Sequence, residues 1–319
     1  MRKNGEIMVI SINELNKMLT FLRYMSSKNH GIDESLRGWN WHTPPVEPPT
    51  HAINLSVSEI SYRYCTTMRD IYLKRVLKIK TNPSSPMLEG KLYHEIIKLV
   101  SLSAKKLIYG DLIKTGDELI LKLLNKAEEQ VNELIQRIFK SLEEKDYLTL
   151  IKKRAIRLWN YIALQIASRY DLLISRYGVY SKDTIAQLSV MYIVERVIDG
   201  SRIGLSDKLV VDAFEPGNVL IEFKTGKRED FHKLALAGYA LALESETNIP
   251  TDYGVLIYIR MNGELYPRIE AKPILIDEEL RREFIDLRDQ AMAMILNERD
   301  PGTPYNCYPL CPYKEYCMR

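Results

Sequence analysis

Two charged residues stand two positions apart in an otherwise apolar stretch of the chain. Glu222 and Lys224 lie in the segment 219–224, whose other residues are all apolar. The alternation of a β-strand places both side chains on the same face. Charged side chains in an apolar strand are costly to bury unless they bind each other or a ligand. The pair is therefore either a same-face salt bridge or part of a site.

A second carboxylate and a histidine extend this candidate site. Asp207 lies on the segment predicted as the preceding strand, and paired carboxylates are ligands that Mg²⁺ or Mn²⁺ prefers. Such a cation can polarise a phosphodiester and lower the pKa of an attacking water, while Lys224 orients that water or stabilises developing negative charge. His94, on a predicted helix that also carries Gly90, could add an imidazole ligand, although a lone histidine is more often structural.

The four cysteines form a second candidate site. Cys307, Cys311 and Cys317 cluster at the end of the sequence, and Cys65 lies far upstream. Four thiolates from distant segments can bind a four-iron four-sulfur cluster or a tetrahedral zinc ion. Unrelated reduced cysteines are the third interpretation, but such tight clustering favours metal or cluster binding.

Hydrophobic periodicity and turn residues predict the elements that position these groups. A helical region precedes a set of short strands and two further helices, which is an α/β (α+β) order. We expect helices over Met8–Met25, Leu55 to about Lys80, from near Met87, and within Asp111–Tyr177; strands over Met191–Ile198, Arg202–Val211 and Val219–Lys224; a helix over Glu229–Ser245; strands over Tyr253–Arg260 and Arg268–Ile276; and a helix over Glu278–Asn297.

Four parts follow from this order. Residues 1–54 form an N-terminal helix and a proline-rich linker, 55–188 a helical region, 189–276 the core with the charged strand, and 277–319 a C-terminal helix with the cysteine-bearing tail.

Composition excludes a disordered protein, a collagen and a coiled-coil fibre. The 319 residues are 46% hydrophobic and 27% charged, which is an ordinary globular balance. The net charge is only +3, so any nucleic-acid contact must come from local charge. No apolar run reaches the roughly 18 residues of a membrane span, and the N-terminus lacks signal-peptide features, so we expect a cytoplasmic protein with no membrane partner.

The acidic pair and its lysine resemble a known nuclease family. Asp207 followed by Glu222-x-Lys224 resembles the PD-(D/E)XK restriction-endonuclease-like core, and Gly90-Lys-Leu-Tyr-His94 is similar to its RecB-like branch. The resemblance implies a catalytic Lys224 and a divalent metal, Mg²⁺ or Mn²⁺, with these ligands: His94, Asp207, Glu222 and the backbone carbonyl of Phe223. It also implies an auxiliary Tyr239 from a Gln-x3-Tyr motif, in which Ala235 replaces the glutamine.

The cysteine layout resembles a narrower family. One early cysteine and three late ones, with the sequence around Cys65, are similar to the CRISPR-associated exonucleases of Cas family four, Csa subtype. The resemblance implies a four-iron four-sulfur cluster on Cys65, Cys307, Cys311 and Cys317, although three residues rather than two separate the first two late cysteines. It also implies metal-dependent cleavage of DNA, often single-stranded and from an end, in the processing of spacer precursors. CRISPR integrase and adaptation proteins would be the partners, and an oligomer is possible.

Three other functions remain open at the level of sequence. The same core serves RecB-like repair nucleases without a CRISPR role. Ala235 is compatible with a catalytically silent DNA-end-binding subunit, against which the intact His94, Asp207, Glu222 and Lys224 argue. A zinc-stapled nucleic-acid-binding module is the third, and a visible absorption spectrum separates it from an iron–sulfur protein.

Overall fold

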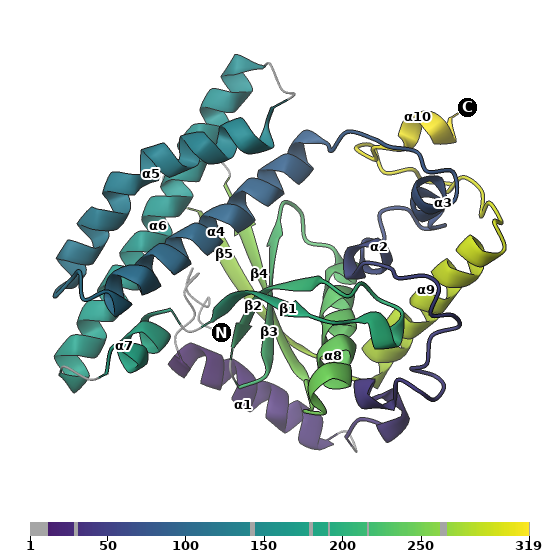
Figure 1. The fold of residues 1–319 in the computed structure, drawn as a ribbon, viewed down its shortest axis with the longest axis horizontal. Helices are drawn as coiled ribbons and strands as arrows, with labels where there is room; N and C mark the ends of the chain where they lie inside the picture. Colours follow the sequence, from purple (N-terminus) through teal and green to yellow (C-terminus); the bar gives the residue numbers. More distant parts are fainter. Residues whose placement is uncertain are drawn as a thin grey trace.

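A five-stranded mixed sheet forms the centre of the molecule (Figure 1). The computed structural model describes residues 12–28, 31–140, 144–178, 181–190, 192–215, 217–261 and 267–318. Within them the strands follow the chain order β1-β2-β3-β4-β5 across the sheet. All neighbours are antiparallel except β3 and β4, which run parallel. Their bounds are Ile193–Ile198 (β1), Leu209–Glu215 (β2), Val219–Thr225 (β3), Tyr253–Arg260 (β4) and Arg268–Leu275 (β5).

Helices cover both faces of this sheet. In Figure 1, α4, α5 and α6 lie side by side on one flank, and α8 and α9 lie on the other. The α-helices of the described residues are α1 (Ile12–Lys28), α2 (Val57–Ser61), α3 (Arg69–Arg75), α4 (Ser85–Tyr109), α5 (Gly116–Ile138), α6 (Lys145–Tyr177), α7 (Lys182–Ser189), α8 (Leu234–Thr247), α9 (Glu278–Leu296) and α10 (Lys314–Cys317). None of these helices is both long and apolar enough to cross a membrane.

Two hydrophobic cores result, one on each face of the sheet. Ile221 and Phe223 of β3 belong to the core that contains α1, α4, α5 and α6, with Trp159 of α6 fully buried in it. Leu220, one position along the same strand, belongs to the core of α8 and α9. Alternate side chains of β3 thus pack into the two cores, as expected for a central strand that is covered on both faces.

The fold confirms most of the predicted elements. The strand over Tyr253–Arg260 has the predicted bounds, and the helices of α8 and α9 start or end within a few residues of their predictions. The first helix is α1, and its predicted start at Met8 lies outside the described residues. The α/β order is thereby confirmed, whereas the division of the chain into four parts stays a prediction.

Two predicted elements are wrong in detail. The helix predicted from Leu55 to about Lys80 is two short helices, α2 and α3, separated by a turn that carries Cys65. The strand predicted over Arg202–Val211 starts only at Leu209, because the preceding residues form a 3-10 helix over Ser201–Ile203 and a turn. The second error means that Asp207 lies in a turn, whereas Asp212 lies on the strand.

Candidate active site

Glu222 and Lys224 are buried side by side on β3. Their residues are 5% and 6% exposed, and Lys224 Nζ lies 2.6 Å from Glu222 Oε1. The predicted same-face placement is confirmed, and the two groups do form a salt bridge. The other oxygen, Glu222 Oε2, is buried and has no hydrogen-bond partner among the described residues. A salt bridge alone leaves this acceptor unsatisfied, so the pair is suited to bind something further.

Asp212 of β2 lies next to this pair. Its Oδ2 accepts a hydrogen bond from the backbone N–H of Phe223 at 2.9 Å, and its Oδ1 lies 2.9 Å from His94 Nδ1. The ladder between β2 and β3 runs from Glu215–Val219 to Ala213–Ile221. The Asp212 carboxylate therefore takes the next N–H of β3, which holds it against the strand that carries Glu222.

His94 of α4, a helix that packs against the sheet, contacts Asp212. Burial acts to lower the pKa of His94, but the charge and hydrogen bond of Asp212 outweigh it and raise the pKa above its ordinary value. The predicted histidine is thus brought to the strand carboxylates. Asp212 fixes the orientation of the imidazole, as carboxylates do for metal-ligating histidines.

Asp207 does not belong to this group. Asp207 is exposed in the turn before β2. The second carboxylate, which lies against the strand of Glu222, is that of Asp212. The prediction that Asp207 lies on a strand is therefore wrong. The run Leu209–Phe214 did contain the signal, because Asp212 is a charged residue among apolar neighbours, as Glu222 is.

The environment raises the pKa of Glu222 and lowers that of Asp212. Burial and the Asp212 charge raise the pKa of Glu222 to about 7, although Lys224 opposes them. Burial acts to lower the pKa of Lys224, but the charges of Glu222 and Tyr62 outweigh it and raise that pKa. Lys224 therefore stays a cation, held between a carboxylate and an aromatic ring.

Tyr62 is a contact that sequence reasoning missed. Its hydroxyl lies 3.3 Å from Lys224 Nζ, which in turn stands 4.7 Å from the centre of the Tyr62 ring. Tyr62 follows α2 directly, so only the tertiary fold brings it to β3. No local pattern in the sequence marks this contact.

Tyr239 approaches the same group from α8. Burial, followed by the charges of Glu222 and Asp212, raises its pKa well above the ordinary value. Ala235, one turn earlier on α8, is buried and offers no polar side-chain atom. The structure thus brings the predicted tyrosine near the carboxylates, and the glutamine of the motif has no substitute at Ala235.

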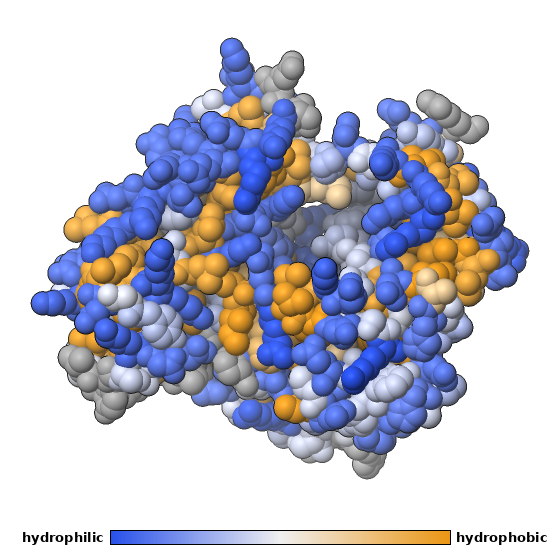
Figure 2. Space-filling model, viewed as in Figure 1, coloured by the Kyte–Doolittle hydropathy of each residue, from blue (hydrophilic) through white to orange (hydrophobic). Residues whose placement is uncertain are grey.

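A broad groove opens above these residues. It has a volume of about 1490 Å³ and is lined by α4, the end of β3, the α2–α3 turn and the C-terminal tail. His94, Phe223 and Lys224 form part of its wall. Figure 2 shows it as a hollow between α4 and the α2–α3 region. Lys224 and His94 therefore face the groove, whereas Glu222 lies buried behind them.

The donor atoms fit a hard divalent cation. Two carboxylates and an imidazole are oxygen and nitrogen ligands that suit Mg²⁺ or Mn²⁺, and Glu222 Oε2 has no hydrogen-bond partner in the part of the chain that the structure describes. Within the described ranges, however, no three His, Cys, Asp or Glu side chains are gathered in a geometry ready for a metal ion. The donors satisfy one another instead, through the Asp212–His94 and Glu222–Lys224 contacts.

The four cysteines come from two segments that the fold joins. Arg69 of α3 pairs with Asp300 at 2.9 Å, and Thr67 donates to the Gly302 carbonyl at 2.9 Å. Thr303 in turn donates to the carbonyl of Cys317 at 3.3 Å. The turn of Cys65 therefore lies beside the tail of the late cysteines, and Figure 1 shows α3 next to α10.

All four thiols are free, with Cys65 buried and the others partly buried. Burial and the neighbouring Cys307, Asp70 and Cys65 raise the pKa of Cys311 to about 11, against a hydrogen bond from the Tyr313 backbone. Thiols that influence one another in this way suit a shared cation or cluster, which would deprotonate them. Thiol ligands are of the kind that bind an iron–sulfur cluster or zinc. Within the described residues, however, no three cysteine side chains are gathered in a geometry ready for a metal ion.

The chain is similar to known proteins over most of its length. A family model described as "CRISPR-associated exonuclease Csa1" matches residues 8–319. A protein of that name from Saccharolobus solfataricus is 34% identical over 302 residues, covering 94% of this chain and 97% of its own. Another of that name from Thermoproteus tenax is 29% identical over 288 residues, covering 90% and 91%.

Proposed function

Since the chain belongs to the Csa1 family of CRISPR-associated exonucleases, we propose that it is a metal-dependent deoxyribonuclease of a CRISPR system. The observation that carries this proposal is the buried Glu222–Lys224 pair with an unpartnered carboxylate oxygen, next to Asp212 and His94 in the wall of a long groove. We assign the sheet and its flanking helices to a PD-(D/E)XK-type core on the same grounds.

Asp212, Glu222 and His94, with the Phe223 carbonyl, are the groups that would hold Mg²⁺ or Mn²⁺, and Asp212 replaces Asp207 in this set. A bound cation supplies polarisation of the phosphodiester and a lowered pKa for the attacking water. Lys224 remains protonated beside Glu222 and stabilises the negative charge that develops on the phosphate oxygens. The Asp212 carboxylate keeps the imidazole and β3 in place through its two hydrogen bonds.

The substrate we propose is single-stranded DNA attacked from an end. The groove carries cations that can bind phosphates, among them Lys91, Lys227 and Arg260. Three of the carboxylates that share it are already paired, Glu59 with Arg75, Glu89 with Arg154 and Glu95 with Arg137. The family name supports an association with CRISPR. We propose in addition that the protein acts in CRISPR adaptation and trims spacer precursors together with integrase and adaptation proteins.

We propose that the cysteines hold a four-iron four-sulfur cluster, with zinc as the alternative. Its role is structural, because the turn of Cys65 and the C-terminal tail both line the groove. A brown protein with iron and sulfide after anaerobic purification supports the cluster, whereas a colourless protein with zinc supports the alternative.

The experiment that tests the proposed function is a cleavage assay on end-labelled single-stranded DNA. We expect cleavage with Mg²⁺ or Mn²⁺, none with a chelator, and none for Glu222→Gln with either metal. A wild-type protein that binds DNA but never cleaves it, with its metal and cluster content verified, would instead support a silent DNA-end-binding subunit. The apolar Ala235 is the observation that favours this second function.

A further inference from the structure

Tyrosine rings gather along one wall of the groove. Tyr62 and Tyr64 come from the turn after α2, and Tyr308 comes from the C-terminal tail. Tyr62 is 42% exposed, an unusual position for a large ring next to a buried charged pair. The rings of Tyr64 and Tyr308 lie 4.5 Å apart between centres with a tilt of 32°. Phe231 meets Tyr64 edge-on at 4.8 Å.

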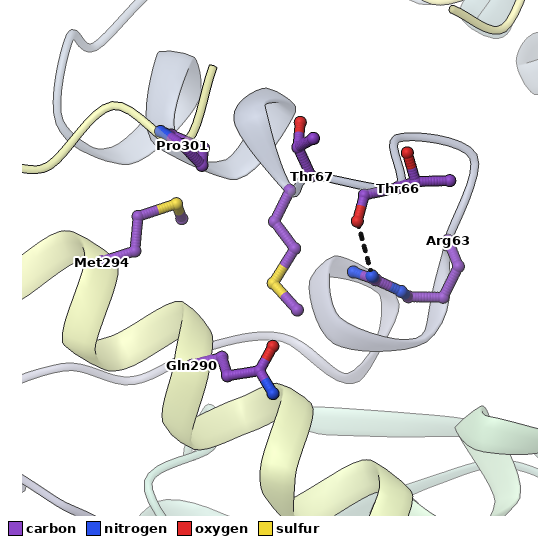
Figure 3. Close-up of a pocket in the computed structure, with 7 residues that line it drawn as sticks. Arg63, Thr66, Thr67, Gln290, Met294 and Pro301 are labelled. Atoms are coloured by element: carbon purple, nitrogen blue, oxygen red, sulfur yellow. Dashed lines mark hydrogen bonds between the residues drawn. The ribbon is translucent and has the colours of Figure 1, made fainter. Parts of the chain in front are cut away.

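Tyr64 is restrained by its contacts with Tyr308 and Phe231 and by the closure of its own turn. Arg63 donates a hydrogen bond of 2.9 Å to the Thr66 carbonyl, which closes the turn that carries Tyr64 (Figure 3). A restrained ring stacks on a nucleobase at little cost in conformational entropy.

The Tyr62 end of this wall lies beside Lys224, where we place the phosphate to be cleaved. Tyr62 touches Lys224 through both its hydroxyl and its ring face, so a base held by Tyr62 has its phosphate close to that cation. The groove pairs these aromatic groups with Lys91, Lys227 and Arg260. Stacking rings beside a cationic track are the combination that single-stranded nucleic acids bind.

We propose that Tyr62, Tyr64 and Tyr308 form a base-stacking wall that grips the unpaired bases of a single DNA strand and presents its phosphates to Lys224. This inference rests on the proposed function, because it takes the groove as the DNA site. The bases of an intact duplex are stacked on each other and expose no faces to such a wall. The wall therefore selects single-stranded ends over blunt duplex.

Equilibrium binding without divalent cations tests the wall independently of cleavage. The probes are a fluorescein-labelled single-stranded oligothymidine and an abasic oligonucleotide of the same length and charge. We expect the wild-type protein to bind the abasic strand at least about tenfold more weakly, since stacking on one base is commonly of that size. Tyr64→Ala and Tyr308→Ala should each weaken binding of oligothymidine about tenfold and leave binding of the abasic strand unchanged.

Matched variants separate stacking from folding. Tyr308→Trp should retain the affinity, because an indole also stacks. Tyr305→Ala removes a fully exposed tyrosine of the same tail that does not line the groove, and it should change neither affinity. Equal wild-type affinity for the base-bearing and abasic strands would overturn the proposal, as would an equal loss of both in Tyr64→Ala. A protein that passes this binding test but never cleaves would refute the nuclease function and leave the wall standing.

Discussion

At the scale of single residues, the Glu222–Lys224 contact explains why charge is tolerated inside the sheet. Desolvation of two charges costs several kcal/mol for each ion, and the 2.6 Å contact offsets much of it. Glu222 Oε2 nevertheless has no partner among the described residues. A purely structural pair would be satisfied at both oxygens, so the arrangement favours a working site.

The assignment of Asp212 is testable against Asp207. Asp212→Asn should lower metal-dependent cleavage by about a hundredfold or more, because it removes a charged donor beside Glu222 and His94. Asp207→Asn, in the exposed turn before β2, should stay within a few-fold of wild type. The measurement is single-turnover cleavage of end-labelled single-stranded DNA at saturating protein. Loss of activity in Asp207→Asn with normal activity in Asp212→Asn would restore the sequence-based assignment.

Lys224 should affect turnover and stability in different ways. Lys224→Met should slow cleavage about a hundredfold with DNA affinity little changed, because one stabilising charge at the reacting phosphate is lost. It should also destabilise the fold by about 3 kcal/mol, because Glu222 is left buried without its cation.

The double variant Glu222→Gln/Lys224→Met tests the second effect. Removing both charges should restore part of the free energy of unfolding that the single variant loses. Urea unfolding in the presence of a chelator measures the wild type, the single variants Glu222→Gln and Lys224→Met, and the double variant. Strictly additive losses would show that the two groups do not interact in the folded protein.

At the scale of elements, the errors of the sequence-based predictions have a common cause. Residues 204–206 lie in the predicted strand, but their backbone pairs with the distant Leu55, through Leu55 N–H to Gly204 O and Ser206 N–H to Leu55 O. Gly204 takes a positive φ of 71°, which ends the preceding 3-10 helix. A partner so far away in sequence leaves no local signal, so the strand was predicted too early and Asp207 with it.

The helix predicted from Leu55 to about Lys80 failed for a similar reason. Its start was predictable: Ser56 caps α2 and forms a capping box with Glu59. The break was not, because the segment between α2 and α3 contains neither glycine nor proline, and Met68 turns the chain with a φ of 60°. The tail contacts of Arg69 and Thr67 stabilise that turn. Local periodicity thus located the strand of Glu222 and the helix of His94, and a charge among apolar neighbours marks Asp212. Only Tyr62 required the tertiary fold.

Glu59 gives this region a pH-dependent stability. Hydrogen bonds and charges of Arg75, Ser56 and Lys74 outweigh burial and lower the pKa of Glu59 to about 2 from its ordinary value of 4.5. A depressed carboxyl pKa contributes stability above the unfolded value, and this is lost as pH falls from about 4.5 toward 2. Glu59→Gln should therefore be less stable than wild type at pH 7, by up to about 3 kcal/mol, and the difference should shrink below pH 4.5.

Urea unfolding at a series of pH values measures this difference. Glu128→Gln is the matched control, because Glu128 pairs with Lys152 on the exposed surface, where an ion pair adds little. A stability gap between wild type and Glu59→Gln that stays constant from pH 7 to pH 3 would contradict the assignment.

At the scale of the whole molecule, one buried carboxylate joins four parts of the chain. Glu244 of α8 accepts from Arg37 at 2.9 Å, from the N–H groups of Gly38 and Thr251, and from Arg281 of α9. Both Glu244 and Arg281 are fully buried. These contacts therefore bind the proline-rich segment before α2 to helices α8 and α9, so the segment is not a free linker.

Loss of this carboxylate should loosen that segment. Glu244→Gln should destabilise the protein by about 3–5 kcal/mol, because the guanidinium groups of Arg37 and Arg281 lose their fully buried counter-charge and keep only that of the partly exposed Asp252. Protease cleavage within residues 31–54 should become faster at the same time. Glu246→Gln is the control on the same helix, since its side chain is 38% exposed. Unchanged cleavage of the segment in a destabilised Glu244→Gln would show that other contacts hold it.

A cluster shared by the cysteines would close a loop of more than two-thirds of the chain. Cys65 and Cys307 are separated by more than two-thirds of the chain, yet the Arg69–Asp300 and Thr67–Gly302 contacts bring their segments together. The entropy of closing a loop rises only logarithmically with its length, so a cluster shared by both segments can outweigh that cost. Without it, surface ion pairs and hydrogen bonds hold the tail, and each of these contributes little.

Cys65→Ala should therefore lower the melting temperature, the iron content and the sulfide content together in anaerobically purified protein. Binding of single-stranded DNA should weaken as a consequence, because Tyr64 and Tyr308 stand next to Cys65 and Cys307 on the groove wall. Thr66→Ala is the control, since this exposed side chain belongs to the same turn but carries no thiol. Full iron content in Cys65→Ala with an unchanged melting temperature would exclude Cys65 from the cluster, and the late cysteines would then bind their metal without it.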